Sequence, residues 1–270
     1  MNTPIEPRVA HKRDAPGIIG IVGGIGPYAG LDLNHKIFDQ TRARTDQDHM
    51  SVLTLSLPRQ IPDRSAFLLG QSQDDPAAGI VHCLRILEGA GASVAGIACN
   101  TAHSPRIFNA VNAALRALGS EIILVNMIRE VAMFLRMHYS SVKKVGVLGT
   151  DGTIRANAYA EVLNEEGIST IYPDPNVQHG LVHPAIYDPE YGIKAKSEPV
   201  TEKARAHVLE AARHLLEDRG GEALVLGCTE LPLVVQERQL YGKPVIDPTL
   251  VLARALIAHV APEKLLPFES

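Results

Sequence analysis

The sequence predicts an α/β fold of two similar Rossmann-like (flavodoxin-like) domains, each with a parallel sheet. The two domains are expected to be related by pseudo-twofold symmetry, with the active site in the cleft between them. Three observations predict this architecture: short apolar runs alternate with helical stretches, most of these runs are apolar throughout, and the order of landmarks repeats. Runs that are apolar throughout are typical of parallel strands covered on both faces. Alternation of strands and helices also indicates parallel sheets.

The expected strands are short runs rich in β-branched residues, many of them bounded by glycine. They cover residues 18–22, 51–55, 94–98, 122–126, 145–148, 169–172, 223–226 and 244–246. Longer stretches between them are expected to be helices. They include residues 77–89, 129–138, 155–166 and 201–219.

The order of landmarks in the first half of the chain recurs in the second. One strand ends at Gly23-Gly24, and a later one is followed by Cys99-Asn100-Thr101; their counterparts end at Gly149-Thr150 and precede Gly227-Cys228-Thr229. The offset between the halves is nearly the same at both landmarks, which indicates a duplicated unit. Ligands of such sheets bind beyond the carboxyl ends of the strands. We therefore expect Cys99 and Cys228 to face each other across one cleft.

The expected domain division follows from this repeat. Residues 17–116 together with 240–270 are assigned to the first domain, and residues 117–239 to the second. Residues 1–16 are polar, contain three prolines and lack the apolar core of a signal peptide. We expect them to form a disordered tail.

Composition limits the function classes. The chain has 270 residues, a net charge of −4 and no tryptophan, which argues against nucleic acid or an acidic membrane as a partner. No apolar run approaches the roughly 20 residues that span a bilayer. Three cysteines in such a chain indicate reduced thiols rather than a disulfide framework. The expectation is a cytoplasmic protein that binds a small molecule.

Cys99 and Cys228 are the candidate catalytic residues. Each follows an apolar strand and precedes residues that often begin helices, and a helix N-terminus favours a thiolate and can bind a carboxylate. Racemisation at an α-carbon needs a base on one face and an acid on the other, and thiols suit both tasks because their ordinary pKa is about 8.5. Cys83 lies inside a helical run and is expected to be structural.

Four motifs carry a resemblance to a known family. They are Gly23-Gly24-Ile25-Gly26-Pro27-Tyr28-Ala29, Ile61-Pro62-Asp63-Arg64, Cys99-Asn100-Thr101-Ala102-His103 and Gly227-Cys228-Thr229-Glu230-Leu231. In type and order they resemble the motifs of the aspartate/glutamate racemase family. The resemblance implies two similar α/β domains, a substrate between them, no cofactor and a two-base mechanism. It is closer to the aspartate-racemase branch, because glutamate racemases of the cell-wall pathway usually have His at the position of Glu230.

The resemblance also implies substrate-binding residues. Arg64 would hold the side-chain carboxylate, and Lys194 would be a second basic residue facing the substrate, although Lys196 stands where the family often has Gly. His103 could support the thiolate or only cap and pack. The remaining substrate-binding candidates are Gly26, Asn100, Thr101, Thr150, Thr229 and Glu230.

Two other motifs were weighed. Gly24 to Ala29 also fits a dinucleotide fingerprint, but the expected second strand has no acidic residue at its end. His179 and His183 are four residues apart, yet Gly180 and Pro184 interrupt the segment. We expect no metal and no nucleotide, and we read the region of Asp188 and Glu190 as a loop, and as a candidate lid over the cleft.

Alternatives within the same fold remain open. Hydantoin racemases and maleate isomerases share the two-cysteine cleft, and a non-catalytic binder of acidic metabolites could use it without chemistry. Binding of a dicarboxylic amino acid through Arg64 and Lys194 would favour an amino-acid racemase over a hydantoin racemase. A homodimer is expected from the resemblance and from the frequency of closed dimers.

Overall fold

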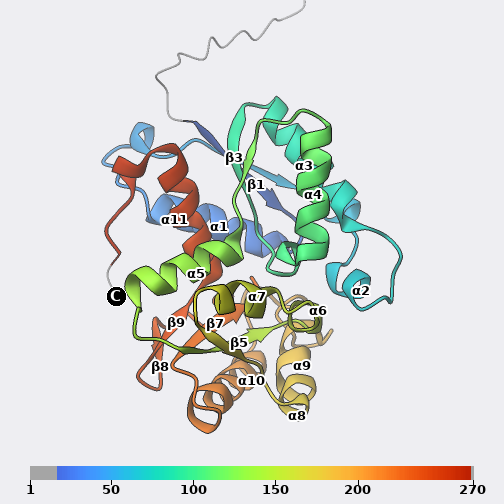
Figure 1. Cartoon of the computed structure of the whole chain (residues 1–270), viewed down its shortest axis with the longest axis vertical. Coiled ribbons are helices and arrows are strands. Elements are labelled where there is room, and N and C mark those ends of the chain that lie inside the picture. Colours follow the sequence, from blue (N-terminus) through green and yellow to red (C-terminus); the bar gives the residue numbers. More distant parts are fainter. Residues whose placement is uncertain (1–16, 269–270) are drawn as a thin grey trace, which may run out of the picture.

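The structure is a computed structural model that describes residues 17–268, so the expected tail of residues 1–16 lies outside the described part. It contains two sheets, one above the other in Figure 1. The first has the order β2 (Val52–Ser56), β1 (Ile18–Gly23), β3 (Ala92–Ile97) and β4 (Ile123–Leu124), and its paired strands are parallel.

The second sheet repeats this order and extends it by one strand. Its order is β6 (Ser169–Ile171), β5 (Lys144–Gly149), β7 (Ala223–Gly227), β9 (Lys243–Ile246) and β8 (Gln239–Leu240). Only the pair β8–β9 is antiparallel. The two α/β units with parallel sheets are therefore confirmed, with β1 and β3 corresponding to β5 and β7.

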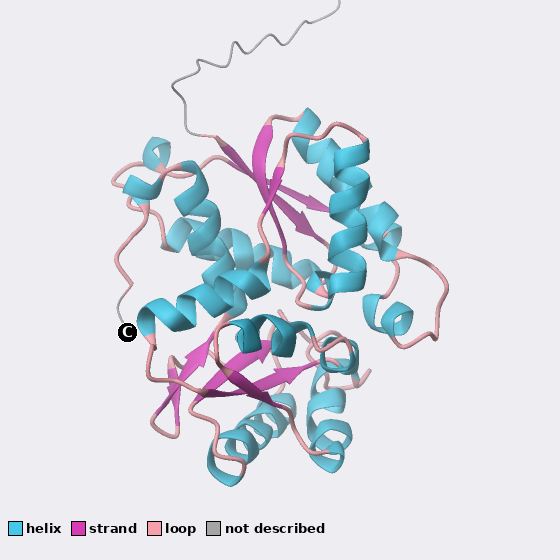
Figure 2. Ribbon diagram, viewed as in Figure 1, coloured by secondary structure: helices cyan, strands magenta, loops and turns pink. Residues whose placement is uncertain are grey.

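Helices cover both faces of each sheet (Figure 2). They are α1 (Pro27–Asp39), α2 (Arg64–Leu68), α3 (Pro76–Gly89), α4 (Pro105–Ala117), α5 (Met127–His138), α6 (Asp151–Arg155), α7 (Ala158–Glu165), α8 (Pro175–Val177), α9 (His183–Tyr187), α10 (Glu202–Arg213) and α11 (Pro248–Val260). Helices α3 and α4 pack on the outer face of the first sheet, and α9 and α10 on that of the second. The expected helices at 77–89, 129–138 and 201–219 are confirmed to within a few residues, the last ending in a π-helical turn.

Helices α5 and α11 lie between the two sheets and contact each other (Figure 1). Each has apolar side chains on both sides: Met127 and Leu252 join the core of the first sheet, whereas Val131 and Val251 join that of the second. Burial on both sides stabilises the helices and holds the two sheets together, at about 25 cal/mol for each Å² of apolar surface removed from water. The carboxyl ends of β3 and β7, which precede Cys99 and Cys228, are therefore fixed relative to each other.

Helix α1 is tied to the start of α11 by charge. The Lys36 ammonium lies 2.5 Å from Asp32 and 2.6 Å from Asp247, whose carboxylate also caps α11. All three side chains are largely shielded from water, and such a pair resists separation because breaking it leaves a buried charge. The contact fixes the direction of α1, whose N-terminus lies at the candidate site.

Three features differ from the sequence-based expectation. The helix expected at residues 155–166 begins only at Ala158, as α7, because Asn157 before it adopts a left-handed conformation (φ 50°) that separates α7 from α6. Strand β8 was not expected. Strand β4 pairs with the first sheet and β9 with the second, although the expected segments put each in the other domain; the domain division itself stays a proposal.

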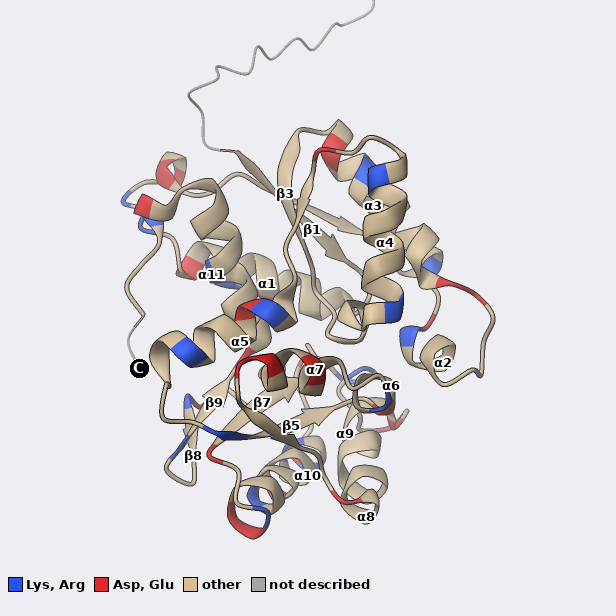
Figure 3. Ribbon diagram, in the orientation of Figure 1, with Lys and Arg blue, Asp and Glu red and all other residues tan. Residues whose placement is uncertain are grey.

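Acidic and basic residues are interspersed over both halves (Figure 3), as the small net charge suggests. Within residues 17–268, no helix is long and apolar enough to cross a membrane.

Candidate active site

Cys99 lies two residues after the end of β3 and is 6% exposed. The Arg64 guanidinium, at the start of α2, lies near the Cys99 sulfur and donates to the carbonyl oxygens of Ile25 (2.9 Å) and Pro62 (3.1 Å). Burial opposes the charge on Arg64, but the negative charges of Cys99 and neighbouring carboxylates outweigh it and raise the pKa of the guanidinium. The sulfur therefore has a permanent cation beside it.

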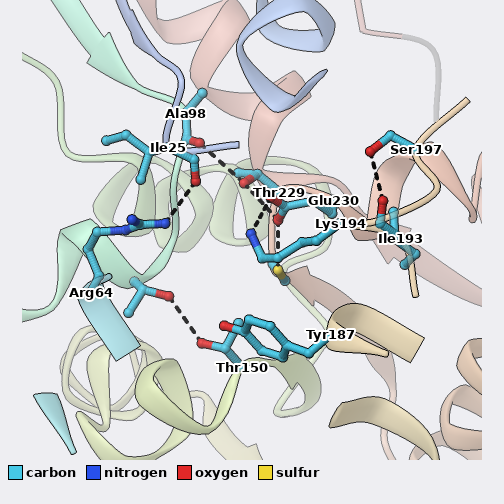
Figure 4. Close-up of polar contacts among 12 residues, drawn as sticks. Ile25, Arg64, Ala98, Thr150, Tyr187, Ile193, Lys194, Ser197, Thr229 and Glu230 are labelled. Atoms are coloured by element: carbon cyan, nitrogen blue, oxygen red, sulfur yellow. Dashed lines mark hydrogen bonds and ion pairs between the residues drawn. The ribbon is translucent and has the colours of Figure 1, made fainter. Parts of the chain in front are cut away.

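Cys228 directly follows β7, at the equivalent strand end, and is 4% exposed. Its thiol donates to Glu230 Oε2 at 3.0 Å, and Glu230 Oε1 forms an ion pair with Lys194 Nζ at 2.6 Å (Figure 4). Burial and the Glu230 carboxylate raise the pKa of the Cys228 thiol well above its ordinary value, while Lys194 opposes them. Burial also acts to raise the pKa of Glu230, yet Lys194 and the thiol hydrogen bond lower it overall.

The two strand ends meet across the halves. Thr229 Oγ1 donates to the carbonyl oxygen of Ala98 at 3.2 Å, so a neighbour of one cysteine binds a neighbour of the other (Figure 4). The hydroxyl of Thr101, from the first half, lies 3.1 Å from Thr150 Oγ1 and 2.9 Å from Thr153 Oγ1 in the second. These contacts bring the Cys99 and Cys228 segments into one buried polar cluster.

Asn100 is 1% exposed, and its carbonyl oxygen accepts a hydrogen bond from the buried Tyr159 hydroxyl. Its amide nitrogen has no hydrogen-bond partner among the described residues. A buried donor without a partner loses about 1–3 kcal/mol relative to water. The amide is thus a free donor directly beside Cys99.

The glycine loop after β1 borders a cavity of about 270 Å³. The cavity is lined by Gly26 from this loop, by Tyr28 at the start of α1, and by Lys194, Ser197 and Glu230 from the second half. Gly26 lies so close to Glu230 that a methyl group on it would stand 2.3 Å from Oε1. Neither cysteine lines this cavity, but Glu230 and Lys194 do, and Glu230 contacts the Cys228 thiol.

His103 takes the packing role rather than the electrostatic one. Its Nδ1 donates to the Cys99 carbonyl oxygen at 2.8 Å, and its ring stacks on Phe108 with centroids 5.1 Å apart. Complete burial lowers the pKa of His103 to about 4. The ring is therefore neutral near pH 7, and it holds the backbone of Cys99 instead of supplying a charge.

One expectation about the cysteines is wrong. Neither is followed directly by an α-helix: Thr101–His103 forms a single 3-10 turn before α4, and Leu231–Leu233 forms another after Cys228. A three-residue turn has almost no aligned peptide dipole. The charged groups beside the two sulfurs are side chains instead, Arg64 near Cys99 and Glu230 with Lys194 near Cys228.

Several residues that join the halves were not expected from the sequence: Ser65, Thr153, Tyr159 and Tyr187. Ser65 Oγ, next to Arg64, lies 3.2 Å from Thr150 Oγ1 and 3.3 Å from the Tyr187 hydroxyl. No local pattern could have found these contacts, because the partners are far apart in the sequence. Asp188 and Glu190 do lie in a loop, which leads to Lys194.

His179 and His183 do not belong to a group of side chains arranged to bind a metal ion within residues 17–268. His179 and His183 lie in one continuous helical stretch, and His183 Nδ1 is 2.8 Å from an Asp151 oxygen. Over residues 17–268, no group of three His, Cys, Asp or Glu side chains is arranged to hold a metal ion.

Comparison with known proteins agrees with this geometry. The family model described as Asp/Glu/hydantoin racemase matches residues 22–256. The chain belongs to this family. The aspartate racemase of Picrophilus torridus superposes with a TM-score of 0.74 at 29% identity, covering 92% of this chain and 97% of that one. A glutamate racemase of Francisella tularensis, with a TM-score of 0.60 and 18% identity, covers 94% of this chain and 85% of its own and shares the fold.

The curated relatives match over a shorter stretch. A glutamate racemase of Limosilactobacillus reuteri is 35% identical over 143 residues, which is 52% of this chain and 46% of the relative. One from Aquifex aeolicus is 29% identical over 186 residues, or 65% of this chain and 61% of the relative. The match thus spans about half of the first relative's length and less than two thirds of the second's.

Proposed function

We propose that the protein is a cofactor-independent amino-acid racemase that interconverts L- and D-aspartate or glutamate, with Cys99 and Cys228 as the two bases. The observation that carries this proposal is the pairing of two buried thiols at equivalent strand ends, linked by the hydrogen bond from Thr229 to Ala98. Two symmetry-related sheets would present the sulfurs to opposite faces of one α-carbon.

The chemistry needs only a proton transfer on each face. The thiolate of one cysteine takes the α-proton and becomes a thiol, and the electron pair stays on the α-carbon and its carboxylate. The thiol of the other cysteine then delivers its proton to the opposite face and becomes a thiolate. The Asn100 amide and the Arg64 guanidinium would stabilise the negative charge, which costs less in a buried, pre-organised site than in water.

Two cations support an acidic substrate. Arg64 and Lys194 lie on opposite halves of the site, so a dicarboxylic amino acid could bridge them. Lys194 is already paired with Glu230, so a substrate carboxylate would have to share or displace that contact. The similarity to the Picrophilus torridus aspartate racemase favours aspartate as the first substrate to try.

The test is proton exchange and chirality in one sample. Purified protein with reduced thiols and no added cofactor is incubated in heavy water with each enantiomer of a panel of amino acids. We expect the α-proton signal of aspartate or glutamate to disappear in the NMR spectrum, and chiral chromatography to show both enantiomers. Folded protein that exchanges no amino acid in the panel would contradict the proposal and direct attention to hydantoins, maleate or binding without catalysis.

Two further expectations from the sequence, a homodimer and a cytoplasmic location, stay predictions.

A further inference from the structure

We propose that Glu230 keeps the proton on Cys228 in the resting enzyme, and that position 26 is glycine because the Glu230 carboxylate occupies the space of a side chain there. Glu230 is then a positioning residue for one of the two bases, instead of a substrate ligand. This proposal rests on the proposed function for its meaning, but its test needs no turnover.

The contacts of Glu230 leave it little freedom. Its carboxylate is 3% exposed; one oxygen accepts from the Cys228 thiol at 3.0 Å, and the other pairs with Lys194 at 2.6 Å (Figure 4). Thr229 Oγ1 is a further neighbour of Oε2 at 3.5 Å. A carboxylate with both oxygens engaged inside the protein has a defined orientation.

The proton in the Cys228–Glu230 hydrogen bond belongs on sulfur. The Lys194 ammonium and the nearby Arg64 guanidinium stabilise Glu230 as an anion. A thiolate beside that anion would place two negative charges about 3 Å apart in a buried site, which is unfavourable. Cys228 thus begins as the acid.

Gly26 supplies the room for this arrangement. A Cβ at Gly26 would stand 2.3 Å from Glu230 Oε1 and 3.3 Å from its Cδ. To relieve such a contact the Glu230 carboxylate would have to shift from its position between Lys194 and Cys228. Glycine at position 26 therefore leaves the Glu230 carboxylate in place, and this carboxylate keeps the proton on Cys228 in the other half of the protein.

The ionisable groups around Cys228 come from several elements. Glu230 follows on the same segment, Lys194 lies in the loop after α9, Tyr187 ends α9, and Tyr159 lies on α7. Burial raises the pKa of both tyrosines, so they are neutral near pH 7. Glu230 and Lys194 are then the two charges that determine the titration of Cys228.

The experiment follows each thiol separately by NMR. The full chain is labelled with ¹³Cβ-cysteine, the Cys228 signal is assigned by its loss in Cys228→Ser, and its chemical shift is recorded against pH. In Glu230→Gln the anion is gone and Lys194 remains, so the midpoint should move to lower pH by about one to three units. Gly26→Ala should move it in the same direction while every ionisable group is retained.

Two control variants test whether the shift of the Cys228 midpoint has the proposed cause. Lys194→Met leaves the anion without its cation and should move the midpoint upwards, whereas mere loosening of the site would move it downwards. Glu237→Gln removes another carboxylate of the same segment, one that pairs with Arg205, and should change nothing. If Glu230→Gln does not fold, Gly26→Ala provides the test.

A Cys228 signal that titrates at the same or higher pH in folded Glu230→Gln or Gly26→Ala would overturn the proposal. A downward shift in protein that racemises no amino acid would leave this proposal standing and contradict the proposed function.

Discussion

The ends of β3 and β7 occupy equivalent places in two similar sheets, yet their cysteines have different electrostatic surroundings. Cys99 lies near the Arg64 guanidinium, whereas the Cys228 thiol donates a hydrogen bond to the Glu230 carboxylate. The strands position the two sulfurs, whereas the loops and short helices around them supply the neighbouring charged side chains. Duplication of a fold therefore gives two similar positions without giving them the same chemistry.

This difference suits a reaction that needs one acid and one base at the start of each cycle. The Arg64 cation lies beside Cys99, whereas the Glu230 anion beside Cys228 favours a thiol there. The Lys194 ammonium partly offsets the effect of the Glu230 carboxylate, so that Cys228 can still give up its proton and become a thiolate. The following predictions test how far the two ends differ, from the largest expected effect to the smallest.

Replacing either cysteine by serine should abolish racemisation. Cys99→Ser and Cys228→Ser should each lower kcat/KM for racemisation by about 10²- to 10⁴-fold, the contribution of one acid–base group. The measurement is chiral chromatography of aspartate and glutamate. Cys83→Ala, on the buried face of α3, is the matched control and should keep its turnover. A serine variant with near wild-type racemisation would contradict the two-base scheme.

Arg64→Lys should reduce kcat/KM by about 10²-fold, the cost of losing one oriented donor in such a site. A lysine keeps the charge, but it cannot contact the sulfur while also donating to Ile25 and Pro62. Steady-state kinetics measure the loss. The control is Arg59→Lys, an exposed arginine of the same loop. Equal activity of the two variants would show that the Arg64 geometry is unimportant.

Stability should fall in acid because of His103. Its pKa is lowered to about 4 in the folded protein, so between pH 6.5 and 4 the unfolded chain binds the proton that the folded one excludes. Linkage then removes up to about 3 kcal/mol of the free energy of unfolding as the pH falls through this range. Urea unfolding at pH 7 and 4.5 should show a smaller difference for His103→Gln. The control is His35→Gln, at an exposed histidine, which should show the same difference in free energy of unfolding between the two pH values as the wild type. A wild-type difference in His103→Gln would refute the prediction.

Ser65→Ala should have the smallest effect. It removes the hydroxyl that lies near both Thr150 and Tyr187, at a cost of about 1 kcal/mol in binding or closure. We expect less than a tenfold rise in KM with kcat nearly unchanged. Ser72→Ala, in the loop after α2, is the control. A fall in kcat alone would mean that Ser65 takes part in the reaction instead of joining the halves.

Apolar patterning predicted eight strands, because a buried parallel strand needs the same residues wherever it occurs. It missed β8, since Gln239 and Leu240 are too few to form a pattern. It also began the helix of α7 three residues too early, because the left-handed turn at Asn157 depends on its surroundings. The expected domain boundaries separate β4 and β9 from the sheets with which they pair, since strand pairing is decided across the whole chain.

The site was predictable where chemistry is local. The motif Gly227-Cys228-Thr229-Glu230 put a carboxylate two residues after a thiol, and the strand-end turn made them partners. The electrostatic role expected of a helix N-terminus failed, because three-residue turns follow both cysteines. Two contacts depend on the tertiary fold, so no spacing in the sequence could predict them. They are the contact between Gly26 and Glu230 and that between Ser65 and Tyr187.

The most direct test of the two-base scheme is α-proton exchange by the two serine variants, measured by NMR in heavy water with pure D- and pure L-substrate. Each variant retains one thiol on one face of the α-carbon. We predict that Cys99→Ser exchanges the α-proton of one enantiomer only, and that Cys228→Ser exchanges that of the other enantiomer only. Exchange of the same enantiomer by both variants, or of both enantiomers by either one, would contradict a mechanism with one cysteine on each face.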